Sequence, residues 1–167
     1  MGSDKAELFW TNGQTFLDRA IALLERAGCS RVIVSGDRPG HVHVPDGRPG
    51  LGPLSGIASV LEEYSSLTGQ MLILPVDMPQ LEDRDIRPLL AAAKGRDGAN
   101  FENTPLPMVL EVTPHLRRAV KRLLEENRRA VRGLADRLDL AGVEPVSRRV
   151  FENINSPEDY RSLKENP

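Results

Sequence analysis

The stretch QMLILPVDMPQL, residues 70–81, holds the pattern on which the fold depends. Its apolar run from Met71 to Val76 is typical of a strand buried on both faces of a sheet, and Pro79 ends it. Strands of this kind belong to parallel sheets that helices cover on both sides. The stretch therefore predicts an α/β protein with Asp77 at the carboxyl end of a buried strand.

Helical and strand patterns alternate on both sides of this stretch. Helices are expected at 15–27, 53–67, from about 82, 114–126, 128–140 and after an N-cap at Ser156 with Pro157 next. Strands are expected at 31–36, 41–46, 70–77, 107–112 and 146–154, with a loop at 94–104. Short connections between alternating elements predict one domain, a three-layer α/β/α structure with a mainly parallel, Rossmann-like sheet.

The composition excludes several classes of protein. A formal charge of −2 and a pI near 6.0 give no overall attraction to nucleic acid or to anionic lipid. No apolar run reaches the roughly 20 residues of a membrane span, and the first ten residues lack the apolar core of a signal peptide. Cys29 is the single cysteine, so one chain can form neither a disulfide nor a multi-thiolate metal site. A cytoplasmic protein is expected.

Two features point to phosphate chemistry. Asp77 would reach the edge of the sheet where open α/β folds bind ligands, and a carboxylate there suits Mg²⁺ bridged to substrate phosphates. GLGPLSG, residues 50–56, would let backbone approach a ligand just before the N–H groups of a helix N-terminus. Each has a structural alternative, a turn aspartate and a tight strand-to-helix loop.

Other polar residues are weaker candidates when taken singly. Lys5 could offset charge on a phosphate, although a lysine this near the N-terminus is usually solvated. Asn153 and Asn155 could face one site from alternate positions of a strand, or could serve as turn residues. His41 and His43 lack a third ligand for a metal. Arg128 and Arg129 lie within a basic run, residues 117–137, that covers a solvated helix face, although this pair could meet a phosphate.

The order of these motifs, rather than any one of them, resembles a known family. MGSDK, RVIVSGD, PDGRPGLGPLSGI, LILPVDMPQL and FENINSPEDY follow one another as in the molybdenum cofactor guanylyltransferases of the MobA type, nucleotidyltransferases with a glycosyltransferase-A-like, nucleotide-diphospho-sugar transferase-like fold. The resemblance covers nearly the whole chain and is weakest at 94–150. It implies transfer of GMP from GTP to the terminal phosphate of molybdopterin, with Mg²⁺ bound.

The resemblance also implies roles for individual residues. Asp77 matches the metal-binding aspartate of an Asp-x-Pro motif, and Asn155 matches the asparagine of an Asn-x-Asn-Thr-Pro-Glu motif, here with serine in place of threonine. Lys5 matches the lysine that contacts phosphate. The positions that correspond to nucleotide recognition are Asp46, Gly52, Pro53 and Leu54, and a basic pair toward the molybdopterin corresponds to Arg128 and Arg129.

One departure from the family concerns the start of the motif. In the family a strand and the sequence Leu-Ala-Gly-Gly-x-Ser-x-Arg precede Met-Gly-x-Asp-Lys, whereas this sequence begins at that methionine. The resemblance then implies that a central strand and the glycine loop around the triphosphate are lacking, which predicts two exposed ladder edges. A start assigned too late, a shortened chain and a divergent paralogue would each explain it.

Three hypotheses for function follow. The first is the guanylyltransferase reaction, with GTP and molybdopterin as substrates, Mg²⁺ as cofactor, and a molybdoenzyme or another cofactor-biosynthesis protein as a protein partner. The second is a non-catalytic paralogue that acts as a binding or partner protein. The third is a related nucleotidyltransferase that uses CTP or a sugar phosphate. The first requires Asp77 and Asn155 to converge at one rim of the sheet, beside residues 50–56.

Overall fold

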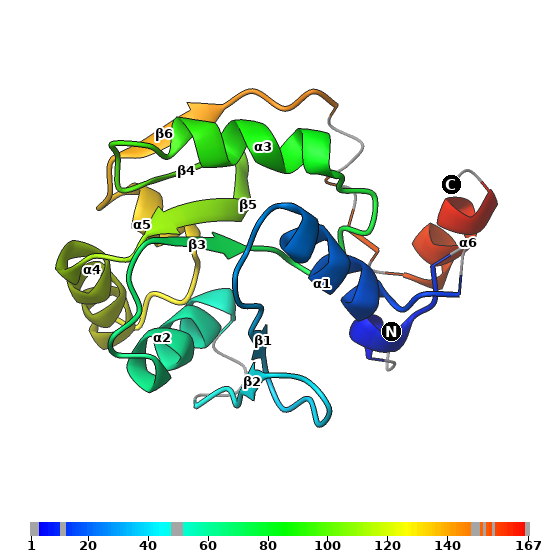
Figure 1. Ribbon diagram of the computed structural model, residues 1–167, viewed down its shortest axis with the longest axis horizontal. Helices are drawn as coiled ribbons and strands as arrows, with labels where there is room; N and C mark the ends of the chain where they lie inside the picture. The colour runs from blue at the N-terminus through cyan, green and yellow to red at the C-terminus, as the bar shows by residue number, and fades with distance from the viewer. Residues whose placement is uncertain are drawn as a thin grey trace.

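The computed structural model describes residues 4–10, 13–47, 52–147, 151, 153–154 and 156–165, with residues 157 and 163–165 described by their backbone alone. Helices and strands alternate for most of the chain (Figure 1). The elements are η1 (Lys5–Glu7), α1 (Phe16–Arg26), β1 (Val34–Ser35), β2 (His43–Val44), α2 (Pro53–Glu63), β3 (Gln70–Ile73), α3 (Asp83–Ala92), β4 (Gly98–Phe101), β5 (Thr104–Glu111), α4 (Pro114–Glu125), α5 (Arg132–Ala135), β6 (Leu140–Val143) and α6 (Pro157–Glu165).

Within the described residues the larger sheet has four strands in the order β3-β5-β4-β6. The strand β5 runs antiparallel to both of its neighbours, β3 and β4, whereas β6 runs parallel to β4. Three of these strands therefore point the same way and β5 points against them. The expected mainly parallel strand direction is confirmed, and β5 is its exception.

Helices cover both faces of this sheet, and the side chains of β5 pack against helices on each face. Met108 and Leu110 belong to the apolar cluster formed with α2, α4 and α5, whereas Val109 belongs to the cluster formed with α3 and β4. Successive residues of a strand point to opposite faces, so the two clusters lie on opposite sides of the sheet. The expected three-layer α/β/α architecture is confirmed.

A second, smaller sheet consists of β1 and β2, which pair in parallel. No described strand pairs with the second edge of β1 or with the outer edge of β3. Both edges border one cavity of about 870 Å³, whose wall is largely apolar and includes Leu24 of α1 and Leu72 of β3. The sheet strands therefore form two separate groups with a hollow lined by both.

Three expected helix starts are confirmed, two of them by capping hydrogen bonds and one by the place of a proline. Thr15 caps α1 and forms a reciprocal capping box with Asp18. Pro53 occupies the first turn of α2. Ser156 and Asp159 exchange backbone-to-side-chain hydrogen bonds of 2.8 and 3.1 Å at the start of α6. None of the helices in the described part of the chain combines the length and the hydropathy that crossing a bilayer requires.

Three expectations for the second half of the chain were wrong. The expected loop at 94–104 contains β4, which forms because β5 and β6 pair with its two edges although Gly98 and Asn100 are poor strand residues. The expected helix at 128–140 is helical only at Arg132–Ala135, since Asn127 turns the chain with a φ of 57° directly after α4. The chain then enters β6.

The expected last strand, 146–154, is not a strand in any of its described residues. Phe151 packs as a single side chain against Phe101 at a ring-centroid distance of 4.8 Å, and the Ile154 side chain is buried. The pairing with β4 belongs to β6, which lies earlier in the chain.

Candidate active site

A lysine and an aspartate that are 72 positions apart in the sequence are in contact beyond the end of β3. The ammonium Nζ of Lys5 donates to Oδ2 of Asp77 at 3.1 Å. Both side chains are partly buried, with 30% and 23% of their surface exposed. Lys5 is therefore not a solvated terminal lysine, and the two residues expected to act on a phosphate lie in contact.

The segment after residue 151 reaches the same point. The backbone N–H of Ile154 donates to the carbonyl oxygen of Asp77 at 3.0 Å, and the Ile154 side chain is buried. Asn153 is exposed. Asn155 lies outside the described residues, so its convergence with Asp77 stays a prediction, which the hydrogen bond of its neighbour favours.

Asp46 lies at the first turn of α2. Its Oδ1 accepts a hydrogen bond of 2.6 Å from the hydroxyl of Ser55, and the N–H of Gly47 donates to the Ser59 hydroxyl at 3.2 Å. A carboxylate is stabilised at this end of a helix by the dipole and by its unpaired N–H groups. The structure thus brings Asp46 together with the glycine-rich turn, as expected.

The described part of that turn begins at Gly52, whose φ of 74° favours glycine. Gly52 and Pro53 are exposed. The Leu54 side chain is fully buried in the core between α2 and α4. A ligand at this turn would therefore meet the backbone of Leu54 rather than its side chain.

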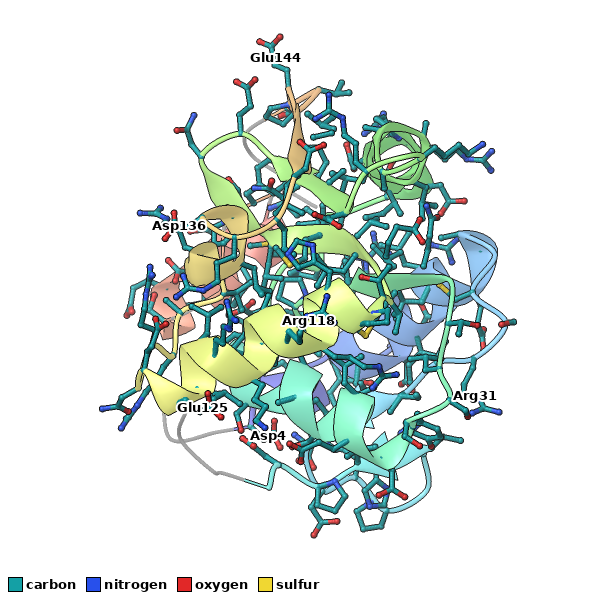
Figure 2. The ribbon with its side chains drawn as sticks, turned by 90° about the vertical axis from the view of Figure 1, so that its left-hand side faces the viewer. Asp4, Arg31, Arg118, Glu125, Asp136 and Glu144 are labelled. Atoms are coloured by element: carbon teal, nitrogen blue, oxygen red, sulfur yellow. The ribbon has the colours of Figure 1, made fainter. Side chains whose placement is uncertain are left out.

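The basic pair lies against this turn as well. A Cβ atom added to Gly52 would stand 3.5 Å from the carbonyl oxygen of Arg129, so the two backbones are neighbours. The Arg128 guanidinium pairs with Asp136 at 2.7 Å, and Arg129 donates to Asn127 at 3.2 Å. Figure 2 shows Asp136 beside the α4–α5 region, with Arg118 on the outer face of α4. Arg128 and Arg129 are exposed cations near the start of α2.

Sequence reasoning assigned no role to Arg38. Its guanidinium pairs with the carboxylate of Asp4, the residue that precedes Lys5 (Figure 2 labels Asp4). The two are 34 positions apart in the sequence. No periodicity or spacing links residues so distant, so only an alignment of related chains could have found the pair.

The histidines expected to share a strand face do not form a metal site. His43 Nδ1 lies 3.0 Å from the carbonyl oxygen of His41, and its Nε2 lies 3.5 Å from Asp37. Among the residues that the structure describes, no group of three or more His, Cys, Asp or Glu side chains could hold a metal by itself. A metal at this end of β3 would need, in addition to Asp77, ligands from outside the described His, Cys, Asp and Glu side chains.

Comparisons with known proteins agree on one family. The family model for the MobA-like NTP transferase domain matches residues 1–141. A molybdenum cofactor guanylyltransferase of Xanthomonas euvesicatoria pv. vesicatoria is 38% identical over an alignment of 172 residues, gaps included. The alignment covers 100% of this chain and 89% of the relative.

Solved structures confirm the nucleotide-diphospho-sugar transferase-like fold. Molybdopterin-guanine dinucleotide biosynthesis protein A of Archaeoglobus fulgidus gives a TM-score of 0.73 at 18% identity, over 98% of this chain and 90% of that chain. A Mycobacterium tuberculosis protein solved in complex with manganese gives a TM-score of 0.58 at 15% identity, over 98% and 93%. At these identities the likeness concerns the fold alone.

Proposed function

Because the chain belongs to the family of MobA-like NTP transferase domains, we propose that it transfers GMP from GTP to the terminal phosphate of molybdopterin. Its relative at 38% identity bears the name of that activity. An oxygen of the molybdopterin phosphate attacks the α-phosphorus of GTP, the bond from that phosphorus to the β-phosphate breaks, and pyrophosphate leaves. The observation that carries the proposal is the contact of Lys5 with Asp77 at the end of β3.

The two residues have complementary parts in this reaction. Asp77 offers a partly exposed carboxylate, which fits Mg²⁺ because that ion is usually held by one or two carboxylates together with substrate phosphates. Asn155 is the second proposed oxygen ligand. Mg²⁺, when bound, supplies positive charge to the phosphate oxygens. Lys5 binds the same phosphate group and offsets the charge that develops there during transfer.

The start of α2 is the proposed binding site for the guanine nucleotide. Gly52 and Pro53 are exposed at the N-terminal end of the helix, where the dipole favours an anion, and Asp46 is held at the first turn by Ser55. Arg128 and Arg129 are the proposed contacts for the phosphate of the acceptor. Exposed arginines suit that role because a guanidinium can bind a phosphate through two hydrogen bonds.

We further propose that one more strand completes the sheet between β1 and β3. The support is the cavity of about 870 Å³, bordered on each side by a strand edge that pairs with no other described strand, because protein interiors are ordinarily packed without hollows of that size. A version with an apolar strand and a glycine-rich loop ahead of Met1 should bind GTP more tightly than the 167-residue chain. Equal affinities would refute this proposal. We also propose that the protein acts in the cytoplasm.

The transfer reaction is tested with GTP, molybdopterin and Mg²⁺, following pyrophosphate release. Asp77→Asn and Lys5→Ala should each lower kcat/KM by about 100-fold or more. Asp139→Asn is the matched control, since Asp139 also pairs with a cation, Arg96, at 2.7 Å but lies on the exposed surface. Activity retained by both site variants would rule out the assigned roles.

A non-catalytic binding protein is the rival, and the edges of β1 and β3 that pair with no described strand beside the cavity favour it. Isothermal titration with GTP and Mg²⁺ separates the two hypotheses. Micromolar affinity together with pyrophosphate release supports the enzyme. GTP binding with no release, or no binding at all, supports the rival.

A further inference from the structure

The connection between β1 and β2 contributes one side chain to the site region. Arg38 lies three residues beyond the end of β1, and its guanidinium pairs with Asp4. The two side chains are 29% and 38% exposed, so the pair is neither fully hydrated nor buried. It joins the loop after β1 to the segment that carries Lys5.

Asp4 also accepts a hydrogen bond that caps η1, the short helix that contains Lys5. Its Oδ1 accepts a hydrogen bond of 3.1 Å from the N–H of Ala6, which caps the three-residue helix η1. Helices this short are not stable on their own, so tertiary contacts set where η1 lies. The described contacts of η1 include the buried side chain of Ala6, the Asp4 pair with Arg38, and the Lys5 pair with Asp77.

We propose that Arg38 is a positioning residue that acts on Lys5 through Asp4. Arg38 holds the Asp4 carboxylate, the carboxylate caps η1, and η1 directs the Lys5 ammonium to the end of β3. Arg38 also neutralises the carboxylate next to Lys5 in the sequence, which leaves Asp77 as the favoured partner of the ammonium. The effect on catalysis rests on the proposed function, whereas the effect on Lys5 itself does not.

The planar guanidinium matters for this role. Arginine binds a carboxylate through a rigid fork, whereas lysine offers a point charge on a flexible stem. Arg38→Lys should therefore keep the charge and part of the positioning, and Arg38→Gln should lose both. Asp4→Asn removes the ion pair but leaves an oxygen that can cap η1, so it separates the ion pair from the cap.

The test measures how fast Lys5 reacts with an amine-acetylating reagent, read by mass spectrometry on the 167-residue chain without nucleotide. Lys121, whose side chain is 78% exposed, is the internal reference. Arg38→Gln and Asp4→Asn should each raise the relative rate at Lys5 by about threefold, the size expected for a half-exposed ion pair. The double variant should add nothing further, and Arg38→Lys should lie between wild type and Arg38→Gln.

Arg96→Gln is the matched control, because it removes an arginine–aspartate pair of the exposed surface and should leave Lys5 unchanged. An unchanged Lys5 rate in both Arg38→Gln and Asp4→Asn, or additive effects in the double variant, would overturn the inference. Arg38→Gln should also lower kcat for transfer by about tenfold, with a smaller change in KM. If Arg38→Gln and Asp4→Asn raise the Lys5 rate but the wild-type chain releases no pyrophosphate, the proposed function fails and the positioning role stands.

Discussion

The strands β5 and β3 are made of similar apolar residues, yet they differ in burial. Met108, Val109 and Leu110 of β5 are at most 1% exposed, whereas Met71 and Leu72 of β3 are only partly buried. The strand β5 is paired along both edges and covered on both faces, while β3 has one edge toward the cavity. The comparison teaches that apolar strand residues are fully buried only where other strands pair with both edges and helices cover both faces.

This difference divides the molecule into a packed part around β5 and an open part around the cavity. The packed part consists of β4, β5, β6 and the helices α2, α3, α4 and α5, and the open part consists of α1, β1, β2 and β3 (Figure 1). Asp77 follows β3 at the boundary and Lys5 approaches it from the N-terminal segment. Stability is expected to come from the packed part and chemistry from its border.

The largest expected effect comes from removing a leucine from each part. Leu110→Ala should lower the free energy of unfolding by about 2–5 kcal/mol, because Leu110 is fully buried and its loss leaves a void. Leu24→Ala, in the cavity wall, should cost about 1 kcal/mol, since its side chain is already partly exposed. Urea unfolding followed by circular dichroism measures both. Equal losses would remove the distinction between the two parts.

An intermediate loss of stability is expected when either of two glycines is replaced by alanine. A Cβ atom at Gly98 would stand 2.1 Å from the carbonyl oxygen of Val109, so Gly98→Ala must push β4 from β5 and should cost about 1–3 kcal/mol. At Gly56 the nearest atom, at 2.2 Å, is the hydroxyl of Ser35, the far end of a side chain that can rotate. Gly56→Ala should therefore cost less than Gly98→Ala, and adding Ser35→Ala should recover stability only in the Gly56 variant.

The smallest expected effect is a change in the alkylation rate of Cys29, which lines the cavity. Burial raises the pKa of the Cys29 thiol, so less of the reactive thiolate is present at a given pH. Alkylation by iodoacetamide at pH 8 should be severalfold slower in the folded protein than in urea. The folded rate should also keep rising to a higher pH than the unfolded rate. Equal rates at every pH would show that the cavity wall near Cys29 is fully open to water.

The sequence was informative where a local signal and the tertiary structure agree. Thr15 and Pro53 begin helices because capping and a fixed φ act within one turn. The strand β4 was missed because its glycine and asparagine carry no strand signal, and pairing with β5 and β6 imposes the conformation. The strand β6 was missed for the same reason, since it is four residues long and contains Gly142.

The candidate site was predictable only in part. Asp77 could be found from its place after the apolar run of residues 71–76, but Lys5 gained significance only through the order of motifs along the chain. Arg38 could not be found at all, since an ion pair across 34 positions depends on how β1 and η1 pack. Side chains that position others leave no mark in the local sequence pattern.

The hydrogen bond from Ile154 to Asp77 has an electrostatic consequence. Because the Ile154 amide donates to the backbone oxygen of Asp77, it offsets part of the negative charge on that oxygen. Cutting the chain ahead of residue 154 would uncover this oxygen beside the carboxylate and make this corner more negative. The segment at Ile154 thus sets the local electrostatic potential beside Asp77, although it lies 77 positions further along the polypeptide.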